Sequence, residues 1–368
     1  MKITIPRQDL LDTVNKVKSV VSAKSALPIL SHILMETDGS SVRLTATDLK
    51  VSIECTVDCD VLEEGTLTVS SQRLSSMLAE MPDKDIELNL LDNNVIEIKC
   101  GQIETKLFSM SPEEFPPVRS FDGIEPLVFK QSVLASLFAK TSFAICTDQA
   151  RYNLTGLLFE VKGSRVTAVA TDGRRMSMCI DDEAIEGGGE FKVIIPSKMI
   201  HELERLFSGD ADVQVFIDES HAAFVFDRLR LVTSLIEGNF PNYEMVMPKR
   251  HDKEVILDTA LLTEAVRRTR TMTNDKFNSV RLIIAKGNVM FRVMTPEVGE
   301  YEEDMDAEYD GENIEIAFNP DFMHDVLRHV ESEKVCLALK DGANPGILKP
   351  YTEAPEDNYI NVIMPIRI

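Results

Sequence analysis

The chain has 368 residues, a hydrophobic content of 44% and only 16 prolines and 17 glycines, which is the composition of a folded protein. It is too long for one ordinary hydrophobic core, so two or three domains are expected. Its formal net charge of −22 would repel nucleic acid if the charge were spread evenly, so a DNA-binding protein of this composition must segregate its basic residues.

The compartment is indicated by what the sequence lacks. No apolar run approaches the ~20 residues needed to cross a bilayer. The N-terminus begins with strand-like alternation instead of a signal-peptide core. The six cysteines show no pairing framework, and no histidine or second cysteine pair lies near Cys55 and Cys59 to complete a zinc site. These features predict a cytoplasmic protein with buried, reduced thiols and no membrane partner.

Amphipathic helices are predicted at corresponding places in the three thirds of the chain. Each third opens with a helix that carries an apolar stripe, and a second helix follows later in the same third. Ser71, Ser197 and Asn319 stand at or near the expected N-caps of the second helices. The six predicted helices span roughly residues 7–24, 72–82, 130–143, 197–208, 259–274 and 320–330.

Strands with alternating apolar residues fill the space between these helices. In each third, two of them are joined by a turn: Asp38-Gly39, Lys162-Gly163 or Lys286-Gly287. The predicted strands are 32–36, 42–48, 51–57, 67–70 and 97–110 in the first third, 154–161, 166–172, 176–181, 191–195 and 222–236 in the second, and 280–285, 289–295, 301–309, 314–318 and 360–368 in the third.

Two short motifs recur with the same period as the helices. Ala46-Thr47-Asp48 returns 124 residues later as Ala170-Thr171-Asp172, and Phe115-Pro116 returns 125 residues later as Phe240-Pro241. Together with the helices in register, they predict three tandem repeated domains. We expect an α+β fold with two helices packed on antiparallel sheets in each domain, and domain limits of 1–120, 121–249 and 250–368.

Charge is segregated between the predicted helices and the rest of the chain. The helices carry 13 lysines and arginines against 8 aspartates and glutamates, so the strands and loops hold all of the acidic excess. Lys198, His201 and Arg205 share one face of their helix, and Arg267 points away from its helix's apolar stripe. An ordinary solvated helix face explains each case alone, whereas agreement between helices favours contact with phosphate.

No catalytic constellation is visible. The six histidines form no metal or triad pattern, and no nucleotide-binding loop is present. Gly187-Gly188-Gly189 lacks the Lys-Ser/Thr of a phosphate loop and is better explained as a hairpin. The recurring Asp48 and Asp172 could be catalytic carboxylates, but acceptance of hydrogen bonds from turn N–H groups is favoured. A non-catalytic scaffold without cofactor or metal is therefore predicted.

Six short segments form a recognisable pattern in this order: Leu27-Pro28-Ile29-Leu30, Thr45-Ala46-Thr47-Asp48, Arg151 to Glu160, Thr171-Asp172-Gly173-Arg174-Arg175, Asn239-Phe240-Pro241-Asn242-Tyr243 and Met364-Pro365-Ile366-Arg367-Ile368. With them the chain resembles the bacterial DNA polymerase III beta subunits, the sliding clamps, over essentially its whole length. The resemblance implies a head-to-tail homodimeric ring of the DNA clamp fold, with helices lining the hole and sheets on the rim.

The implied function is that of a processivity factor in DNA replication. Such a ring encircles double-stranded DNA without sequence preference, and weak phosphate contacts let it slide. By resemblance, the partners are the replicative DNA polymerase catalytic subunit, the clamp loader, and other clamp-binding replication and repair proteins. The alternative is an acidic repeat scaffold that binds peptides without encircling DNA.

The resemblance also implies residues for contact with DNA and for contact between the two copies in the ring. The sequence departs from the family at or beside two of the positions implied for DNA contact: Lys24 stands where some clamps carry arginine, and Asn153 follows Tyr152 where a second aromatic residue can occur. Leu107 and Met272 are implied at the dimer interface. The implied DNA-binding residues are Lys24, Arg73, Gln149, Tyr152, Lys198 and Arg205.

A peptide-binding groove between the second and third domains is implied as well. Its aliphatic and methionine walls suit leucine or phenylalanine anchors. Without the resemblance, Val362 and Met364 could equally be core residues of a last strand. The implied groove residues are Leu154, Thr171, Gly173, Arg174, Arg175, Met176, Pro241, Val246, Phe322, Val362, Met364, Pro365, Ile366 and Arg367.

The segment Val169 to Arg175 combines a shared half and a divergent half. Its Thr-Asp half recurs in the first repeat, where it is expected to hold the same turn. Its Gly-Arg-Arg half has no match in the corresponding Leu49-Lys50-Val51. The divergent half is therefore predicted to mark the groove.

Overall fold

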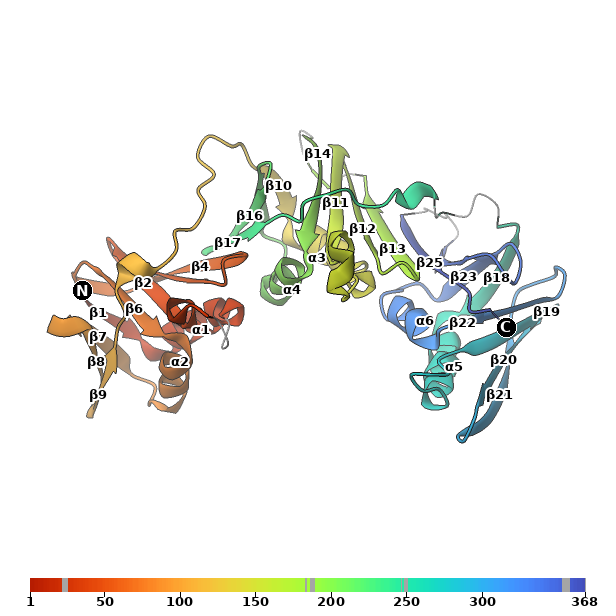
Figure 1. The fold of residues 1–368 in the computed structure, drawn as a ribbon, viewed down its shortest axis with the longest axis horizontal. Helices are drawn as coiled ribbons and strands as arrows, with labels where there is room; N and C mark the ends of the chain where they lie inside the picture. The colour runs from red at the N-terminus through yellow and green to blue at the C-terminus, as the bar shows by residue number, and fades with distance from the viewer. Residues whose placement is uncertain are drawn as a thin grey trace. The chain divides into compact units, whose positions relative to one another are not determined.

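The computed structural model describes residues 1–368 except 22–25, 183, 186–188, 246, 248–250, 353–357 and 368. The chain divides into two compact units. The first unit contains Met1–Ser132 and His201–Leu235, and the second contains Val133–Ile200 and Ile236–Ile368 (Figure 1).

Helices form in all six predicted places. The α-helices are α1 (Arg7–Val17), α2 (Ser71–Glu80), α3 (Gln131–Ala139), α4 (Ser197–Leu206), α5 (Thr259–Thr271) and α6 (Pro320–Leu327). The carboxamide oxygen of Asn319 accepts a hydrogen bond from the N–H of Asp321 and caps α6, as expected. By contrast, α2 and α4 begin at Ser71 and Ser197 themselves. The first helix is shorter than predicted, because α1 continues as a 3₁₀ turn at Lys18–Val20 and residues 22–25 lie outside the described part.

The first unit is built on two antiparallel sheets. Five strands lie in the order β5 (Asp60–Glu63), β1 (Lys2–Pro6), β7 (Asp85–Leu91), β8 (Val95–Cys100) and β9 (Ile103–Phe108). Eight strands lie in the order β10 (Leu127–Lys130), β15 (Asp212–Ile217), β16 (His221–Phe226), β17 (Leu229–Ser234), β4 (Val51–Asp58), β3 (Ser41–Thr47), β2 (His32–Asp38) and β6 (Thr66–Ser70).

The second unit has the same plan of a large and a small antiparallel sheet. Its eight-stranded sheet runs β14 (Gly189–Pro196), β11 (Gly156–Gly163), β12 (Arg165–Thr171), β13 (Arg175–Asp181), β25 (Tyr359–Ile363), β24 (Gly346–Tyr351), β23 (Lys334–Leu339) and β18 (Lys253–Asp258). Its four-stranded sheet runs β21 (Gly299–Asp306), β20 (Asn288–Thr295), β19 (Val280–Ala285) and β22 (Ile314–Phe318).

Each large sheet joins strands from two of the expected repeats, which explains why the units are two and not three. In the first unit β17, from the expected second repeat, pairs with β4 of the first. In the second unit β13, also from the second repeat, pairs with β25 of the third. Ladders of backbone hydrogen bonds therefore cross both expected limits, and the strands of the middle repeat are shared between the units.

Several predicted strands need correction. The predicted strand 97–110 is two strands, because Gly101 turns the chain at a φ of 59°. The predicted strand 222–236 is likewise divided, with Asp227 at a φ of 50°. The last predicted strand, 360–368, ends at Ile363. Strands β5, β7, β10, β15, β18, β23 and β24 were not predicted.

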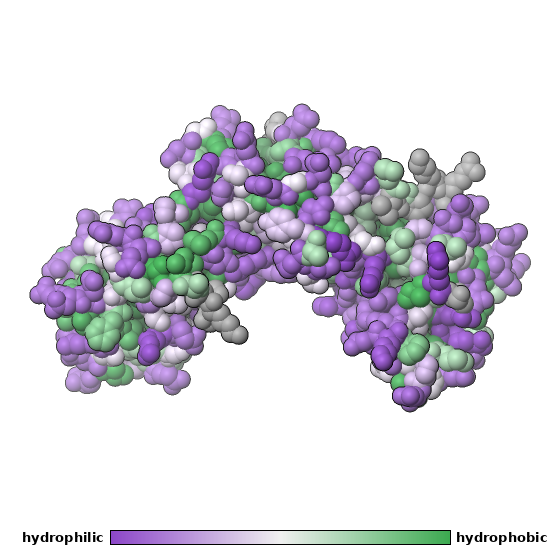
Figure 2. Space-filling model, viewed as in Figure 1, coloured by the Kyte–Doolittle hydropathy of each residue, from purple (hydrophilic) through white to green (hydrophobic). Residues whose placement is uncertain are grey.

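The core follows the predicted apolar stripes. On α1, Leu10, Val14 and Val17 are buried, and on α5 the buried positions include Leu262 and Val266. All six cysteines are buried free thiols, as expected. The molecular face shown in Figure 2 is mainly hydrophilic. Within the described residues, no helix is both long enough and apolar enough to cross a bilayer.

The acidic stretches 297–312 and 351–358 are expected from the sequence to be solvated strand edges or loops, and β21, which lies within the first stretch, forms an edge of the four-stranded sheet. Of the expected glycine hairpin, residues 187 and 188 lie outside the described part, and Gly189 begins β14. Most of the acidic stretch 351–358 lies outside it as well.

Candidate functional site

The turn after β12 is held by the side chains of the recurring Thr-Asp pair. Thr171 Oγ1 donates to the carbonyl of Arg175 at 2.6 Å and accepts from the N–H of Gly173 at 3.0 Å. Asp172 Oδ1 accepts from the N–H groups of Arg174 at 2.8 Å and Arg175 at 3.0 Å. The two side chains therefore bind the backbone groups that a tight turn would otherwise leave unpaired.

The turn after β3 repeats this network bond for bond. Thr47 Oγ1 donates to the carbonyl of Val51 at 3.1 Å and accepts from the N–H of Leu49 at 3.0 Å. Asp48 Oδ1 accepts from the N–H groups of Lys50 at 2.9 Å and Val51 at 2.8 Å. The prediction that both aspartates accept hydrogen bonds from turn N–H groups is confirmed.

Arg175 is the point at which the two turns differ most in structure. Its Nε lies 3.2 Å from Asp172 Oδ2, its Nη1 lies 2.5 Å from Asp325 Oδ2, and its Nη2 donates to the carbonyl of Phe143 at 2.6 Å. The guanidinium also lies 4.5 Å from the centre of the Phe322 ring. Because the side chain is only 12% exposed, Arg175 ties β13 to α6 instead of facing solvent.

The buried floor of the candidate groove lies on one face of the large sheet of the second unit. Leu154, Met176 and Val362 are all buried and belong to one hydrophobic cluster that also contains Val169 and Met178. With an exposure of 1%, Val362 is a core residue of β25. The cluster supplies an apolar base for any side chain placed above it.

The segment after β25 is held to the protein while its apolar side chains remain accessible. The N–H of Met364 donates to the carbonyl of Arg174 at 2.9 Å, and the N–H of Ile366 donates to the carbonyl of Ala317 at 2.8 Å. Met364 is 41% exposed and Ile366 is 36% exposed, while Pro365 is half-buried. The interpretation of Met364 as a core residue is therefore wrong, although the same interpretation holds for Val362.

Polar groups at the rim come from two sides. Arg174 and Arg367 are exposed, and neither forms a side-chain hydrogen bond or ion pair within the described part of the chain. Gly173 has a φ of 82°, and a Cβ there would lie 2.9 Å from Nη1 of Arg151. That same nitrogen donates to the carbonyl of Asp172 at 2.6 Å, so Arg151 braces the turn.

The Phe-Pro motif borders the groove from the segment that precedes the third repeat. Phe240 is buried in the floor cluster, whereas Pro241 is exposed. Asn153 Nδ2 donates to the carbonyl of Asn239 at 2.9 Å, so the residue found in place of a second aromatic fastens this segment. Val246 lies outside the described residues.

Sequence reasoning missed three residues that shape this site: Phe143, Arg151 and Asp325. None of the three could be predicted as a site residue, because their partners are distant in the sequence. Asp325, for example, contacts Arg175 across 150 residues. Arg151 was noted only as the first residue of a segment that matches the family.

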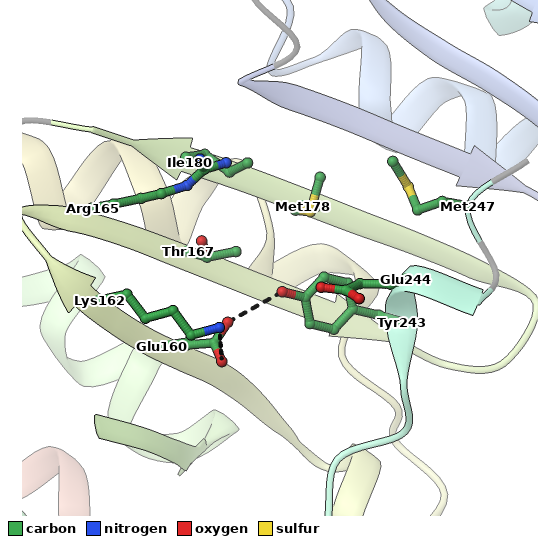
Figure 3. Close-up of a pocket in the computed structure, with 9 residues that line it drawn as sticks. All are labelled: Glu160, Lys162, Arg165, Thr167, Met178, Ile180, Tyr243, Glu244 and Met247. Carbon is green, nitrogen blue, oxygen red and sulfur yellow. Dashed lines mark hydrogen bonds and ion pairs between the residues drawn. The ribbon is translucent and has the colours of Figure 1, made fainter. Parts of the chain in front are cut away.

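A cavity of about 420 Å³ lies on the same face of the sheet, beyond the groove (Figure 3). Met178 lines it and follows Met176 by two residues on β13, so both side chains point to one face. Glu160 Oε1 lies 3.1 Å from Nζ of Lys162 and 3.5 Å from Nζ of Lys192, and Glu160 Oε2 accepts from the Tyr243 hydroxyl at 3.3 Å. This polar cluster fixes the segment that carries Tyr243 over the sheet.

Electrostatics within that cluster favour the charged carboxylate. Burial by itself raises the pKa of Glu160, but the hydrogen bond from Lys162 and the positive charges of Lys192 and Lys162 outweigh burial, so its pKa lies below the ordinary value. Burial and the negative charge of Glu160 raise the pKa of Tyr243 to about 12. Both groups therefore keep their usual protonation at neutral pH.

Comparison with known proteins identifies the family. The N-terminal, central and C-terminal domain models of the DNA polymerase III beta subunit match residues 1–119, 128–242 and 244–367. The chain is also 33% identical over 371 residues to the beta sliding clamp of Pseudomonas aeruginosa, with 100% of both chains covered. The chain belongs to the beta sliding clamp family.

Other relatives agree with this assignment. The beta sliding clamp of Chlamydia muridarum is 31% identical over 368 residues, which cover 100% of this chain and 99% of that protein. The Pseudomonas aeruginosa clamp bound to griselimycin superposes with a TM-score of 0.94 at 33% identity and complete coverage of both chains. The predicted resemblance and the clamp fold are thus confirmed, and a sliding clamp is a non-catalytic subunit.

The residues that the clamp resemblance implied for DNA contact are mostly accessible. Arg73 on α2 is exposed and forms no side-chain ion pair within the described ranges. Gln149 and Tyr152 are exposed on the 3₁₀ segment Gln149–Leu154, and Lys198 is half-buried on α4. Lys24 lies outside the described residues.

Arg205 is less available than the sequence suggested. Its Nε and Nη2 lie 3.0 Å and 2.7 Å from Glu202 Oε2, and Nη2 also donates to the carbonyl of Lys16 and to Ser19 Oγ. The carboxylate of Glu202 is largely buried beside it. Much of the positive charge of Arg205 is therefore balanced within the clamp.

The same distinction separates the arginines of α5. Arg267 is exposed, as predicted, and makes no side-chain ion pair within the described residues. Arg268 pairs with Glu303 at 2.5 Å, and Arg270 pairs with Asp321 at 2.5 Å. Of these three side chains, Arg267 is the one that presents an unbalanced charge.

The two residues implied at the clamp's dimer interface lie near exposed apolar side chains. Leu107 is half-buried on β9, the edge strand of the five-stranded sheet, while its neighbours Ile103 and Phe108 are exposed, Phe108 to 82%. Met272 is half-buried at the C-terminal end of α5, and Met294 on β20 is exposed. The sequence pointed to Leu107 and missed Phe108, the more accessible side chain.

Proposed function

We propose that two copies of this chain form a head-to-tail ring that encircles double-stranded DNA in the cytoplasm. The single observation that carries this proposal is the match of all three beta-subunit domain models in order along the chain. A closed ring stays on DNA by topology, so weak phosphate contacts from Arg73, Arg267 and Lys198 are enough and need no sequence preference.

Ring closure is proposed to use the apolar side chains at β9 and those near the end of α5. An edge strand with unpaired backbone groups and exposed apolar residues invites pairing with another chain. Phe108 and Ile103 supply that surface beside Leu107, and Met294 supplies one near Met272. Three expected domains in each of two copies would complete the ring, with domain limits at 1–120, 121–249 and 250–368.

The groove is proposed to bind short peptides of the replicative polymerase, the clamp loader and other replication and repair proteins. Apolar anchors would rest on the cluster that contains Met176 and Val362, with Met364 closing over them. Arg174 and backbone groups would bind the polar atoms of the peptide, because Arg175 is committed to Asp325 and Phe143.

Retention on nicked circular DNA tests the ring. We expect the loaded protein to co-elute with the circle and to be lost when the circle is linearised, because a ring slides off a free end. Equal retention on both forms, or on neither, would refute encirclement. Equal retention on both would favour a scaffold that grips DNA, and loss from both would favour one that binds only proteins.

The groove is tested by Met364→Ala combined with Pro365→Ala. We expect binding of a polymerase-derived peptide, measured by calorimetry, to weaken by tenfold or more, since truncating hydrophobic anchors in such sites typically costs about 1–2 kcal/mol. Tyr351→Ala, an exposed residue of β24 in the same unit, is the control and should bind normally. Sedimentation should show an unchanged dimer for both variants. An unchanged affinity for the double variant would refute the groove assignment.

A further inference from the structure

The first unit contains a cavity of about 320 Å³ beside the pairing of β4 with β17. The Phe-Pro motif of the first repeat borders it, since Pro116 and Pro117 line one wall. Phe115 itself is buried against Ile29 and Leu30. A turn, a sheet joint and a Phe-Pro segment thus surround this cavity, as they surround the proposed groove in the second unit.

The backbone frames of the two places correspond in detail. Thr233 on β17 pairs with Val51 on β4, as Ile363 on β25 pairs with Arg175 on β13. The hydrogen bond that follows each pairing is also repeated. The N–H of Ser234 donates to the carbonyl of Lys50 at 3.0 Å, in the way that Met364 donates to Arg174.

This register shows which lining residues correspond to groove residues. Six residues that line the cavity occupy positions matched in the proposed groove: Thr47, Leu49, Lys50, Ser52, Val232 and Ser234. Lys50 keeps the positive charge of Arg174. Ser52 and Ser234 stand in place of Met176 and Met364, so hydroxyl groups replace methionine walls. The cavity has the frame of the groove and a more polar lining.

Two lysine or arginine side chains line the cavity, although the whole chain carries a net charge of −22. They are Lys50 and Arg119, and none of the lining residues is acidic. Arg119 Nη2 lies 2.9 Å from Asp218, whose side chain is largely buried, whereas Lys50 is exposed and forms no ion pair within the described residues. A carboxylate is the charge-complementary group for Lys50.

Leu49 adds an apolar contact at the rim. It adopts a φ of 77°, close to the 82° of Gly173, and it is the one aliphatic residue among the non-glycine residues with positive φ in the described part. Leucine is disfavoured in this conformation, and its side chain is 55% exposed, so burial does not compensate for the strain. The strained turn therefore presents an isobutyl group to solvent next to Lys50.

We propose that this cavity is a second peptide-binding site, which takes an extended peptide with a carboxylate side chain next to an aliphatic one. The carboxylate binds Lys50, hydroxyl groups of Ser52 and Ser234 bind the peptide's polar atoms, and Leu49 packs on its aliphatic side chain. The choice of a peptide as ligand rests on the proposed function of the groove, because the two frames correspond.

Photo-crosslinking with a defined probe tests the proposal on the full-length protein. The probe is acetyl-Asp-Leu-Bpa-Asp-Leu-amide, where Bpa is benzoylphenylalanine, and its matched form has asparagine in place of both aspartates. Mass spectrometry of tryptic fragments locates the label. We expect the acidic probe to label the segments around Leu49, Pro117 and Val232, and the asparagine probe to label them about fivefold less.

Variants separate this site from the groove. Lys50→Glu should reduce labelling at the cavity about fivefold, while Lys84→Glu, an exposed lysine of the same unit, should not. Met364→Ala with Pro365→Ala should leave labelling at the cavity intact, so failure of the groove and failure of this site are distinguishable. The proposal is overturned by labelling confined to the groove, by equal labelling with both probes, or by displacement of the acidic probe by duplex DNA at low salt.

Discussion

The turns Thr47–Val51 and Thr171–Arg175 share their side-chain-to-backbone hydrogen bonds and differ in what they present to their surroundings. In the first turn Val51 is buried and Leu49 points to solvent. In the second turn the Arg175 side chain binds the carboxylates of Asp172 and Asp325 and the carbonyl of Phe143. A repeated backbone network can therefore support different surfaces, because threonine and aspartate satisfy the backbone groups of both turns whichever side chains the other positions carry.

The two turns show how a repeat protein can assign backbone structure and ligand binding to different residues. The residues that satisfy backbone groups are the same in both turns, because an unpaired N–H or C=O is costly. The residues between them are free to change with the local partner. In the second unit those residues border an apolar floor, and in the first unit they border a more polar cavity that Lys50 lines.

The largest difference between the turns is expected from Arg175→Met. Removing the guanidinium leaves the partly buried carboxylates of Asp172 and Asp325 without their cation, so the local free energy of opening should fall by about 2–3 kcal/mol. Hydrogen exchange of the amides in β13 and β25 measures it. Arg174→Met, which removes an exposed and unpaired charge, is the control. Equal effects of both changes would contradict the structural role given to Arg175.

A smaller effect is expected from Gly173→Leu, which gives the second turn the residue of the first. The leucine must adopt a φ near 82°, and its Cβ would approach Arg151, so opening of this turn should become easier by about 1–2 kcal/mol. The reciprocal change, Leu49→Gly, relieves strain but adds backbone freedom to the unfolded chain, and should alter stability by under about 1 kcal/mol. Urea unfolding of both variants measures the contrast, which equal destabilisation would disprove.

An equal effect on the two turns is expected from Thr47→Val and Thr171→Val. Each change removes one hydroxyl that both donates to a carbonyl and accepts from an N–H in the turn, so each should cost about 1 kcal/mol. Hydrogen exchange at Leu49 and Gly173 reports on the two turns separately. A cost in one turn alone would mean that the shared half of the motif is not a common scaffold.

The fold was largely predictable from local patterns. The apolar stripe of α5 and the N-cap at Asn319 are decided within a few residues, and the structure agrees with both. Strands β7 and β23, each of which follows a helix, were missed, although Ile86 and Leu88 of β7 alternate with polar residues as in a half-buried strand. The predicted strand region 97–110 is extended as expected, and Gly101 divides it into β8 and β9 because its φ of 59° favours a turn.

The candidate site was predictable only in part. Family resemblance supplied Met176, Val362 and Met364, but not which of them are buried. The structure places Val362 in the core and Met364 at the surface, since the last strand ends at Ile363. The ion pair of Arg175 with Asp325 could not be predicted, because it forms across 150 residues.

The sequence by itself determined the repeat, the turns and the apolar faces, since these depend on interactions between residues close along the chain. Thr171 and Asp172 hold their turn through hydrogen bonds that reach no further along the chain than Arg175. The tertiary structure decided which charges remain free: Arg205 is balanced by Glu202, whereas Arg73 and Lys50 have no ion pair within the described residues. Availability for binding depends on neighbours brought together by folding, and one-dimensional spacing does not record those neighbours.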